Sequence, residues 1–390
     1  TSGSTGLPKG VAFTQYNLVT KRFARAAALP EVGRDEVLLC YLPLFHTFGR
    51  YLELMGMVYW GGTYVFAGNP SKETFLRRLG EIQPSGLIGI PLRWQQVQER
   101  CLEEIGESVS QDEEREVLRS LVGKRLCWGL SAAGYLDPKM FRFFHRNGVD
   151  LCSGFGMTEA TGGITMTPPG EYKDDSVGIP LPGVRTRFAE TEELQLAGPY
   201  TARYLEELEG DDPTEASFDG LRDDYWLATG DLFRIREDGH YEIVDRIKDI
   251  YKNNRGQTVA PRRVEQKFEN VPGIKRTFLV GDRRDYNVLL IVPDTEEQLL
   301  REASSEQERR RYFKNIVTAA NDELIPCERV INIDLLDRDF EADKDELTPK
   351  GSFRRKNIGE NFKALIDDLY TRDYVDVACA GFTVNIPRWL

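Results

Sequence analysis

Short, continuous apolar runs recur through the first two-thirds of the chain and alternate with segments of helical pattern. The runs are Val37–Leu42, Thr63–Ala67, Gly86–Ile90, Leu126–Leu130 and Val149–Cys152. Such runs are typical of strands that are buried on both faces. The segments between them that carry a helical pattern are Ser71–Ile82, Leu92–Ile105 and Pro138–Asn147. This alternation predicts a large α/β domain with a largely parallel sheet.

The pattern changes near Gly239. A predicted strand, His240–Asp245, is followed by a charged interruption, Arg246–Asp249. Beyond it, the patterns predict helices at Val264–Asn270 and Gln307–Leu324 and strands at Thr277–Val280 and Val288–Val292. We therefore expect a large domain over residues 1–247 and a smaller, mobile α+β C-terminal domain over residues 248–390, with a hinge near Lys248.

Composition excludes several classes of function. The 51 Lys and Arg residues are outnumbered by 63 Asp and Glu residues, so the net charge of −12 disfavours nucleic acid as a partner. The chain has only three histidines and its cysteines form no CxxC pair, which argues against a zinc site. It has no apolar run long enough for a transmembrane segment, although peripheral membrane contact remains open. Scattered free thiols fit a reducing compartment, and we expect a cytoplasmic protein.

The opening decapeptide, residues 1–10, is the densest chemical signal. Its glycines allow close approach of the backbone to a ligand, and its hydroxyls and amides can donate to phosphate oxygens. The sequence predicts a nucleotide-binding loop formed by Thr1, Ser2, Gly3, Ser4, Thr5 and Gly6, with Lys9 supplying positive charge. It is not a Walker motif, because Pro8 stands where that motif needs glycine. The alternative is a disordered Gly/Ser terminus.

This loop resembles the phosphate-binding signature of the adenylate-forming superfamily, which includes acyl-CoA synthetases, luciferase-like enzymes and adenylation domains of peptide synthetases. Further segments resemble motifs of that family in the expected order along almost the whole chain. They are Tyr41–Gly49, Ser131–Leu136, Gly154–Glu159, Ser176–Gly183, Tyr225–Asp231 and Asp245–Asp249. The closest type is the long-chain acyl-CoA synthetase.

The resemblance implies roles for individual residues. Nucleotide binding is expected of Ala133, Gly134, Gly154, Phe155, Gly156, Thr158, Asp231 and Arg246. Thr158 is suited to donate to a phosphate oxygen, and the Asp231 carboxylate to accept from both ribose hydroxyls. Glu159 is the expected Mg²⁺ ligand, because that ion prefers hard oxygen ligands and bridges phosphates. His46 is expected near the carboxylate of the acyl substrate.

The chain departs from the family in two places. Alignment on Arg355 puts Ser352 where the family has a catalytic lysine, so Lys350 or Arg354 is the candidate substitute. Arginine is not an automatic replacement for lysine, because its planar fork differs from a point charge. The region that precedes the phosphate loop in the family, which completes the large domain and part of the acyl pocket, is absent from this chain. We therefore expect either a fragment or a protein without an intact acyl pocket.

The leading hypothesis is an ATP-dependent, AMP-forming carboxylate–CoA ligase that acts through an acyl-adenylate. A fatty acid is the expected carboxylic acid, with ATP, Mg²⁺ and CoA as the other small molecules. One alternative is a nucleotide-binding pseudoenzyme or regulator with impaired adenylation, favoured by Ser352. Another is an acyl-AMP ligase that loads a carrier protein, because pantetheine is common to CoA and carrier proteins.

Overall fold

The computed structural model describes residues 9–105, 110–208, 225–295, 297, 300, 305–348, 351–371, 374–379 and 382–387. The chain divides into two compact units, of which the first ends at Ile243 and the second begins at Val244. The predicted nucleotide loop Thr1–Gly6 and the candidate Lys350 lie outside the described residues.

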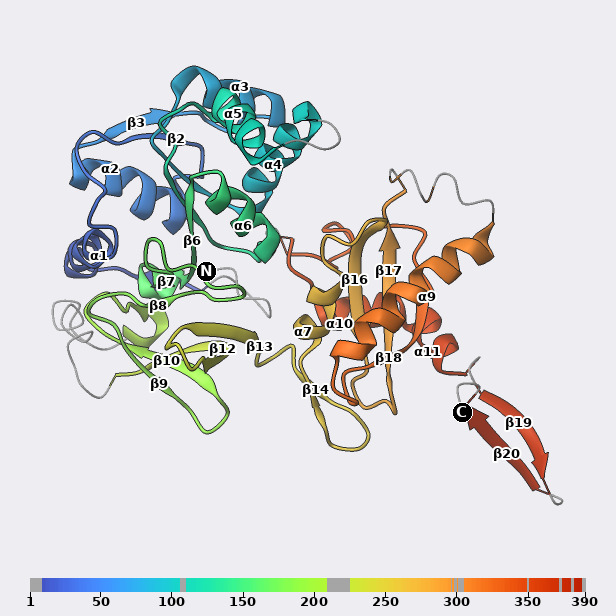
Figure 1. Cartoon of the computed structure of the whole chain (residues 1–390). Helices are drawn as coiled ribbons and strands as arrows, with labels where there is room; N and C mark the ends of the chain where they lie inside the picture. Colours follow the sequence, from blue (N-terminus) through green and yellow to red (C-terminus); the bar gives the residue numbers. More distant parts are fainter. Residues whose placement is uncertain are drawn as a thin grey trace. The chain divides into compact units, whose positions relative to one another are not determined.

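A seven-stranded sheet forms the centre of the first unit (Figure 1). Its order is β3-β2-β4-β5-β6-β7-β8, and the pairs from β3 to β6 are parallel, whereas β7 and β8 are antiparallel. The strands are β2 (Val37–Cys40), β3 (Thr63–Phe66), β4 (Gly86–Gly89), β5 (Trp128–Ser131), β6 (Asp150–Met157), β7 (Gly162–Met166) and β8 (Ile179–Pro180). The predicted α/β domain with a largely parallel sheet is confirmed, because each predicted apolar run contains or overlaps one of these strands.

Helices cover both faces of this sheet (Figure 1). One layer contains α3 (Lys72–Ile82), α4 (Pro91–Ile105), α5 (Gln111–Val122) and α6 (Pro138–Arg146). The other contains α1 (Gln15–Ala28), the π-helix η1 (Phe48–Leu54) and α2 (Met55–Trp60). Asp137 caps α6 by accepting from the amide of Lys139. None of the helices among the described residues has an apolar stretch that could span a bilayer.

Antiparallel strands complete the first unit. A four-stranded sheet has the order β13-β12-β10-β9, formed by β9 (Arg185–Phe188), β10 (Glu193–Ala197), β12 (Leu227–Ile235) and β13 (Tyr241–Arg246). A separate short pair joins β1 (Val11–Ala12) to β11 (Arg203–Tyr204). Two single-turn helices lie between strands in the sequence: η2 (Thr158–Ala160) between β6 and β7, and η3 (Leu205–Leu208) directly after β11. The change in pattern therefore begins well before Gly239, because antiparallel pairing already starts at β7.

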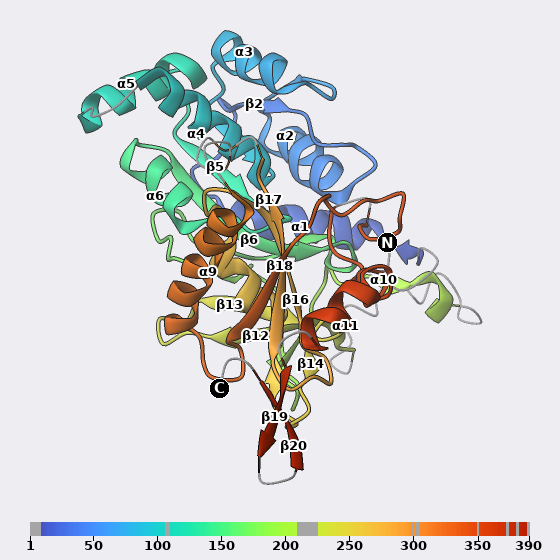
Figure 2. The same cartoon turned by 90° about the vertical axis from the view of Figure 1, so that its right-hand side faces the viewer.

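The second unit is built on the three-stranded sheet β16-β17-β18 (Figure 2). Its strands are β16 (Ile274–Val280), β17 (Asn287–Pro293) and β18 (Val330–Leu335), and its helices are α7 (Pro261–Glu265), η5 (Gln266–Phe268), α9 (Glu306–Glu323), α10 (Arg355–Asn361) and α11 (Lys363–Thr371). Alternate residues of β17 enter two cores: Leu289 packs with Phe313 of α9, and Leu290 packs with Ile358 of α10. Two hairpins complete the unit, β14 (Tyr251–Lys252) with β15 (Thr258–Val259), and β19 (Tyr374–Cys379) with β20 (Phe382–Pro387). The predicted smaller α+β domain is thus confirmed, while its mobility and the boundary at residue 248 stay predictions.

Candidate functional site

The predicted site residues of the large unit follow the carboxyl ends of neighbouring parallel strands. His46 follows β2, Ala133 and Gly134 follow β5, and Gly154–Gly156 form the distal half of β6. Open α/β sheets bind ligands at this edge, because the loops that leave adjacent parallel strands meet there. The topology therefore brings these separate motifs to one edge of the sheet.

Glu159 is held at the end of this edge by two hydrogen bonds. It lies in η2 and is only 6% exposed. Its Oε1 accepts a hydrogen bond of 2.8 Å from the hydroxyl of Tyr204, and its backbone oxygen accepts from the amide of Ala202 at 2.7 Å. Tyr204 also lies under Lys9, whose Nζ is 4.8 Å from the ring centroid. Tyr204 thus joins two predicted site residues that are far apart in the sequence.

Tyr204 is a residue that the sequence reasoning missed. Its position depends on the pairing of β1 with β11, in which Val11 lies opposite Tyr204 and Ala12 opposite Arg203. Strands of two residues give no periodic signal, so no local pattern distinguishes this tyrosine. The same pairing fixes the chain directly after the predicted phosphate loop beside Glu159.

The donor set around Glu159 fits Mg²⁺ bound together with phosphates. Mg²⁺ in such sites is held by one or two carboxylates, with phosphate oxygens and water completing the shell. Glu159 supplies one hard carboxylate of this kind. The arrangement therefore suits an ion that arrives with a nucleotide.

Backbone conformation marks the turn after β5. Ala133 has a φ of 68°, a left-handed value that is uncommon for a residue with a side chain. The preceding residue, Ala132, donates its amide to the backbone oxygen of Gly89 at 3.3 Å, so the turn is attached to the end of β4. Ala133 and Gly134 are exposed at this turn, where their backbone is accessible to a ligand.

The glycine motif on β6 has a structural reason of its own. A Cβ on Gly156 would lie 2.5 Å from the backbone oxygen of Gly162, which would disrupt the pairing of β6 with β7. The ring of Phe155 packs edge-on against Phe233, with 4.9 Å between centroids. This contact places the Phe155 side chain against the four-stranded sheet, so its backbone is the part suited to meet a nucleotide.

His46 lies in the turn that leads into η1. Its Nδ1 accepts from the amide of Phe48 at 3.3 Å, and its backbone oxygen accepts from the amide of Arg50 at 2.9 Å. A neutral imidazole that accepts at Nδ1 carries its proton on Nε2. The structure thus presets one tautomer of the ring, in which Nε2 can donate to a carboxylate.

Asp231 does not lie in the tight turn that its Thr-Gly neighbours suggest. It lies within β12, beside an irregularity in the register between β10 and β12, and Gly230 has a φ of 73°. The amide of Asp231 donates to the hydroxyl of Thr229, which itself donates to the backbone oxygen of Leu194. A bulge of this kind redirects a side chain without ending the strand. Asp231 is 8% exposed.

Arg246 and Lys248 belong to the second unit. Arg246 ends β13, and its backbone oxygen accepts from the amides of Asp249 and Ile250, which closes a turn over the predicted hinge. Asp245, next to it, is buried and accepts from the amides of Arg246 and Arg262. Burial raises the pKa of Asp245 against the effect of these amide donors.

Ser352 is joined to Thr348 by two hydrogen bonds. The amide of Thr348 donates to the backbone oxygen of Ser352 at 2.8 Å, and the Ser352 amide donates to the hydroxyl of Thr348 at 3.1 Å. Arg354 precedes α10, and its guanidinium forms an ion pair with Asp345. This partner competes with any role for Arg354 at a substrate.

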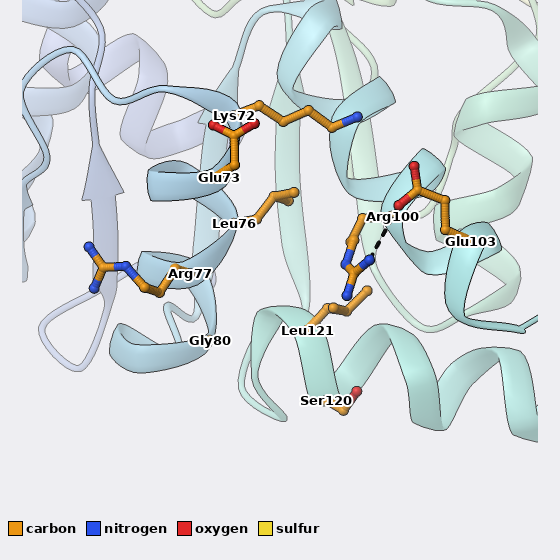
Figure 3. Close-up of a pocket in the computed structure, with 9 residues that line it drawn as sticks. All are labelled: Lys72, Glu73, Leu76, Arg77, Gly80, Arg100, Glu103, Ser120 and Leu121. Carbon is orange, nitrogen blue, oxygen red and sulfur yellow. Dashed lines mark hydrogen bonds and ion pairs between the residues drawn. The ribbon is translucent and has the colours of Figure 1, made fainter.

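Figure 3 shows a hollow between α3, α4 and α5. Its volume is about 620 Å³. Its cations are paired with carboxylates: Lys72 with Glu99 at 2.9 Å and Arg100 with Glu103 at 3.3 Å. The nine residues that line it include none of the predicted site residues. The hollow is therefore separate from the strand edge described above.

Comparison with known proteins gives two consecutive matches to family models. The model described as AMP-binding enzyme matches residues 1–201, and that described as AMP-binding enzyme C-terminal domain matches residues 248–374. Fatty acyl-CoA synthetase A of Dictyostelium discoideum is 28% identical over 97% of this chain and 65% of its own length. Long-chain-fatty-acid–CoA ligase ACSBG1 of Rattus norvegicus is 26% identical over 95% of this chain and 61% of its own length. The chain thus spans less than two thirds of each of these relatives.

Solved structures show the same fold at low identity. ATP-bound MatB from Rhodopseudomonas palustris has a TM-score of 0.70 and 20% identity over 94% of this chain and 67% of that chain. The anthranilate CoA ligase AuaEII, in complex with anthranoyl-AMP, has a TM-score of 0.70 and 19% identity over the same shares of the two chains.

Proposed function

Since this chain belongs to the AMP-binding enzyme family, we propose that it is the catalytic part of an ATP-dependent, AMP-forming carboxylate–CoA ligase. A carboxylate oxygen attacks the α-phosphorus of ATP, the bond to the bridging oxygen breaks, and pyrophosphate leaves. The CoA sulfur then attacks the acyl carbon, and AMP leaves. The first step brings two anions together, so it depends on positioning and on neutralisation of charge.

The observation that carries the proposal is the joining of Lys9, Tyr204 and Glu159. Lys9 and Glu159 both contact Tyr204, and the Glu159 carboxylate can hold Mg²⁺. They lie at the strand edge where His46 and the β5 turn also lie. Mg²⁺ bound there supplies neutralisation of phosphate charge. Lys9 can bind a phosphate oxygen, and Nε2 of His46 can donate to the acyl carboxylate.

We infer that the carboxylic acid is a fatty acid. Two observations support this inference. The relatives are named as a fatty acyl-CoA synthetase and a long-chain-fatty-acid–CoA ligase, and the segment Tyr41–Gly49 resembles a motif of such enzymes. Adenylation at the nucleotide loop Thr1–Gly6 and thioester formation after a movement about Lys248 belong to the same proposal. A carrier protein in place of CoA remains the alternative acceptor.

Ser352 favours the second candidate, a nucleotide-binding protein with impaired adenylation. Serine cannot offset the charge of the two reacting anions. Lys350 is the better substitute for the missing cation, because Arg354 is engaged by Asp345. A working ligase therefore requires Lys350, and a pseudoenzyme does not.

The test is pyrophosphate release by the intact protein with a panel of fatty acids of different length. We expect release by the wild type, a loss of roughly 10²–10³-fold in Lys350→Ala, the scale of one preorganised electrostatic contact, and a smaller change in Arg354→Ala. Lys356→Ala is the matched control, because its side chain is 87% exposed and pairs only at 3.9 Å with Glu360. No release by the wild type, with a large gain in Ser352→Lys, would establish the pseudoenzyme instead.

A further inference from the structure

Helix α1 is packed with its polar face inward. Tyr16, Val19 and Phe23 are 39%, 52% and 59% exposed. On the opposite side, Asn17, Lys21 and Arg25 are 4%, 0% and 5% exposed. Spaced four residues apart, these three lie along one stripe of the helix. We call Asn17, Lys21 and Arg25 the polar stripe of α1.

The first two members of the polar stripe bind backbone oxygens in two segments that follow Glu159 in the sequence. Asn17 Nδ2 donates to the backbone oxygen of Pro199 at 2.8 Å. Lys21 Nζ donates to the backbone oxygen of Gly163 and lies 3.7 Å from the centroid of the Tyr200 ring. The stripe thereby attaches α1 to the segment that follows Glu159 and to the segment that leads to Tyr204.

Arg25 joins two segments that face different substrates. Its Nη1 donates to the backbone oxygen of Tyr51 in η1 at 2.8 Å, and its Nη2 donates to that of Thr161 at 3.3 Å. Helix η1 begins two residues after His46, and Thr161 directly follows the η2 turn that contains Glu159. A single rigid guanidinium therefore spans the acyl side and the nucleotide side.

The backbone around Thr161 is shaped to admit this guanidinium. Thr161 has a φ of 55°, Gly162 has a φ of 99°, and a Cβ on Gly162 would collide with Nη2 of Arg25. The hydroxyl of Thr161 donates to the backbone oxygen of Tyr200 at 2.8 Å, which fixes the turn from its other side. The glycine and the arginine are thus matched to each other.

Burial of these cations is costly. Burial lowers the pKa of Lys21 and that of Arg25, and the neighbouring positive charges lower both further. The hydrogen bonds described above go to backbone oxygens, which compensate a buried charge less well than a carboxylate does. Because apolar side chains would pack here at lower cost, the stripe is best explained by what it positions.

We propose that Arg25 is a positioning residue that couples carboxylic acid binding at the His46 segment to nucleotide binding at the Glu159 turn. This inference rests on the proposed function. When acid orders η1, the Tyr51 oxygen holds the guanidinium, and the guanidinium holds the Thr161 oxygen and with it the η2 turn. By linkage, nucleotide binding strengthens acid binding by the same factor.

The test is a binding cycle on the intact protein, with α,β-methylene-ATP as the unreactive nucleotide and decanoate as the acid. Calorimetry measures the nucleotide Kd with and without decanoate. For the wild type we expect at least a fivefold decrease in Kd when decanoate is present. Arg25→Lys keeps the charge but cannot span both oxygens, and we expect its ratio of the two Kd values to fall to about one.

Arg115→Lys is the matched control, because Arg115 of α5 also donates to a backbone oxygen, that of Arg146, and is expected to keep the wild-type ratio. Gly162→Ala tests the same contact from the other side and is expected to lower the ratio, also if Arg25→Lys fails to fold. Unaltered coupling in a folded Arg25→Lys protein, or a wild-type ratio near one, overturns the inference. Pyrophosphate release by the wild type is measured in parallel, because its absence refutes the proposed function without deciding the binding cycle.

Discussion

Removal of Arg355 should destabilise the second unit, because it leaves a buried carboxylate without its partner. Arg355 Nη1 and Nη2 donate to the two carboxylate oxygens of Glu265 at 3.0 and 2.5 Å. The side chains of Arg355 and Glu265 are 17% and 10% exposed, and the guanidinium lies 5.1 Å from the centroid of the Phe278 ring. The pair is therefore shielded from water on most sides.

The magnitude follows from what stays behind in Arg355→Met. Breaking a buried ion pair by removing one partner costs about 3–5 kcal/mol. The amide of Leu279 still donates to Oε1 of Glu265 at 2.7 Å, so the carboxylate keeps part of its solvation. We therefore expect the low end, about 3 kcal/mol in the free energy of unfolding of the second unit.

The pKa of Glu265 determines how the loss of stability in Arg355→Met changes with pH. Burial raises the pKa of Glu265, and the positive charge of Arg355 opposes that rise. Without Arg355 the pKa of Glu265 rises further, so the folded variant takes up a proton more readily than the unfolded chain does. The deficit relative to the wild type should then shrink as the pH falls from 8 to 5, because protonation removes the uncompensated charge.

Hydrogen exchange of peptides from Ile274–Val280 and Asn287–Pro293 is the assay, because it measures opening of the second unit separately. Arg355→Met/Glu265→Leu removes both charges and should recover at least half of the loss, whereas Lys356→Ala should resemble the wild type. A loss below about 1 kcal/mol, or a double variant as unstable as Arg355→Met, would refute the reasoning.

Three further changes test the site and the stability of the second unit. Tyr204→Phe removes a hydrogen bond to the Glu159 carboxylate and should lower pyrophosphate release roughly 10–100-fold, with a higher Mg²⁺ requirement; an unchanged Mg²⁺ titration contradicts this. Asp231→Ala should weaken ATP binding by roughly 1–3 kcal/mol in calorimetry, and unchanged affinity removes Asp231 from the site. The hydrogen bonds from Arg338 lower the pKa of Glu346 to about 2. The ionised carboxylate therefore stabilises the fold at pH values above the ordinary pKa of a glutamate. This contribution is lost as the pH falls toward 2. Glu346→Gln should therefore be less stable than the wild type in urea at pH 7, with a difference that vanishes near pH 2.

The parallel sheet could be predicted because its strands are short, buried on both faces and separated by helices. The orientation of α1 could not, since its inward residues are Lys21 and Arg25 while Phe23 is exposed, the reverse of the usual amphipathic pattern. The buried Arg25 is bound by the backbone oxygens of Tyr51 and Thr161, and the buried Lys21 by that of Gly163, and these acceptors lie in other parts of the sequence. The role of Tyr204 could not be predicted for the same reason, because its position depends on the pairing of β1 with β11. Motifs thus predicted which segments form the site, whereas the residues that hold the segments together emerged only from tertiary contacts.

The contacts of the residues around Ser352 bear on the choice between a ligase and a pseudoenzyme. Two hydrogen bonds join Thr348 to Ser352, and Arg355 forms the buried ion pair with Glu265. Lys350 is two residues before Ser352 in the sequence and stays the proposed substitute for the missing cation. Because Arg354 forms an ion pair with Asp345, Lys350 is the stronger candidate for the cation that assists adenylation. We therefore favour a cation at another position of this segment, rather than the loss of the cation, as the explanation of Ser352.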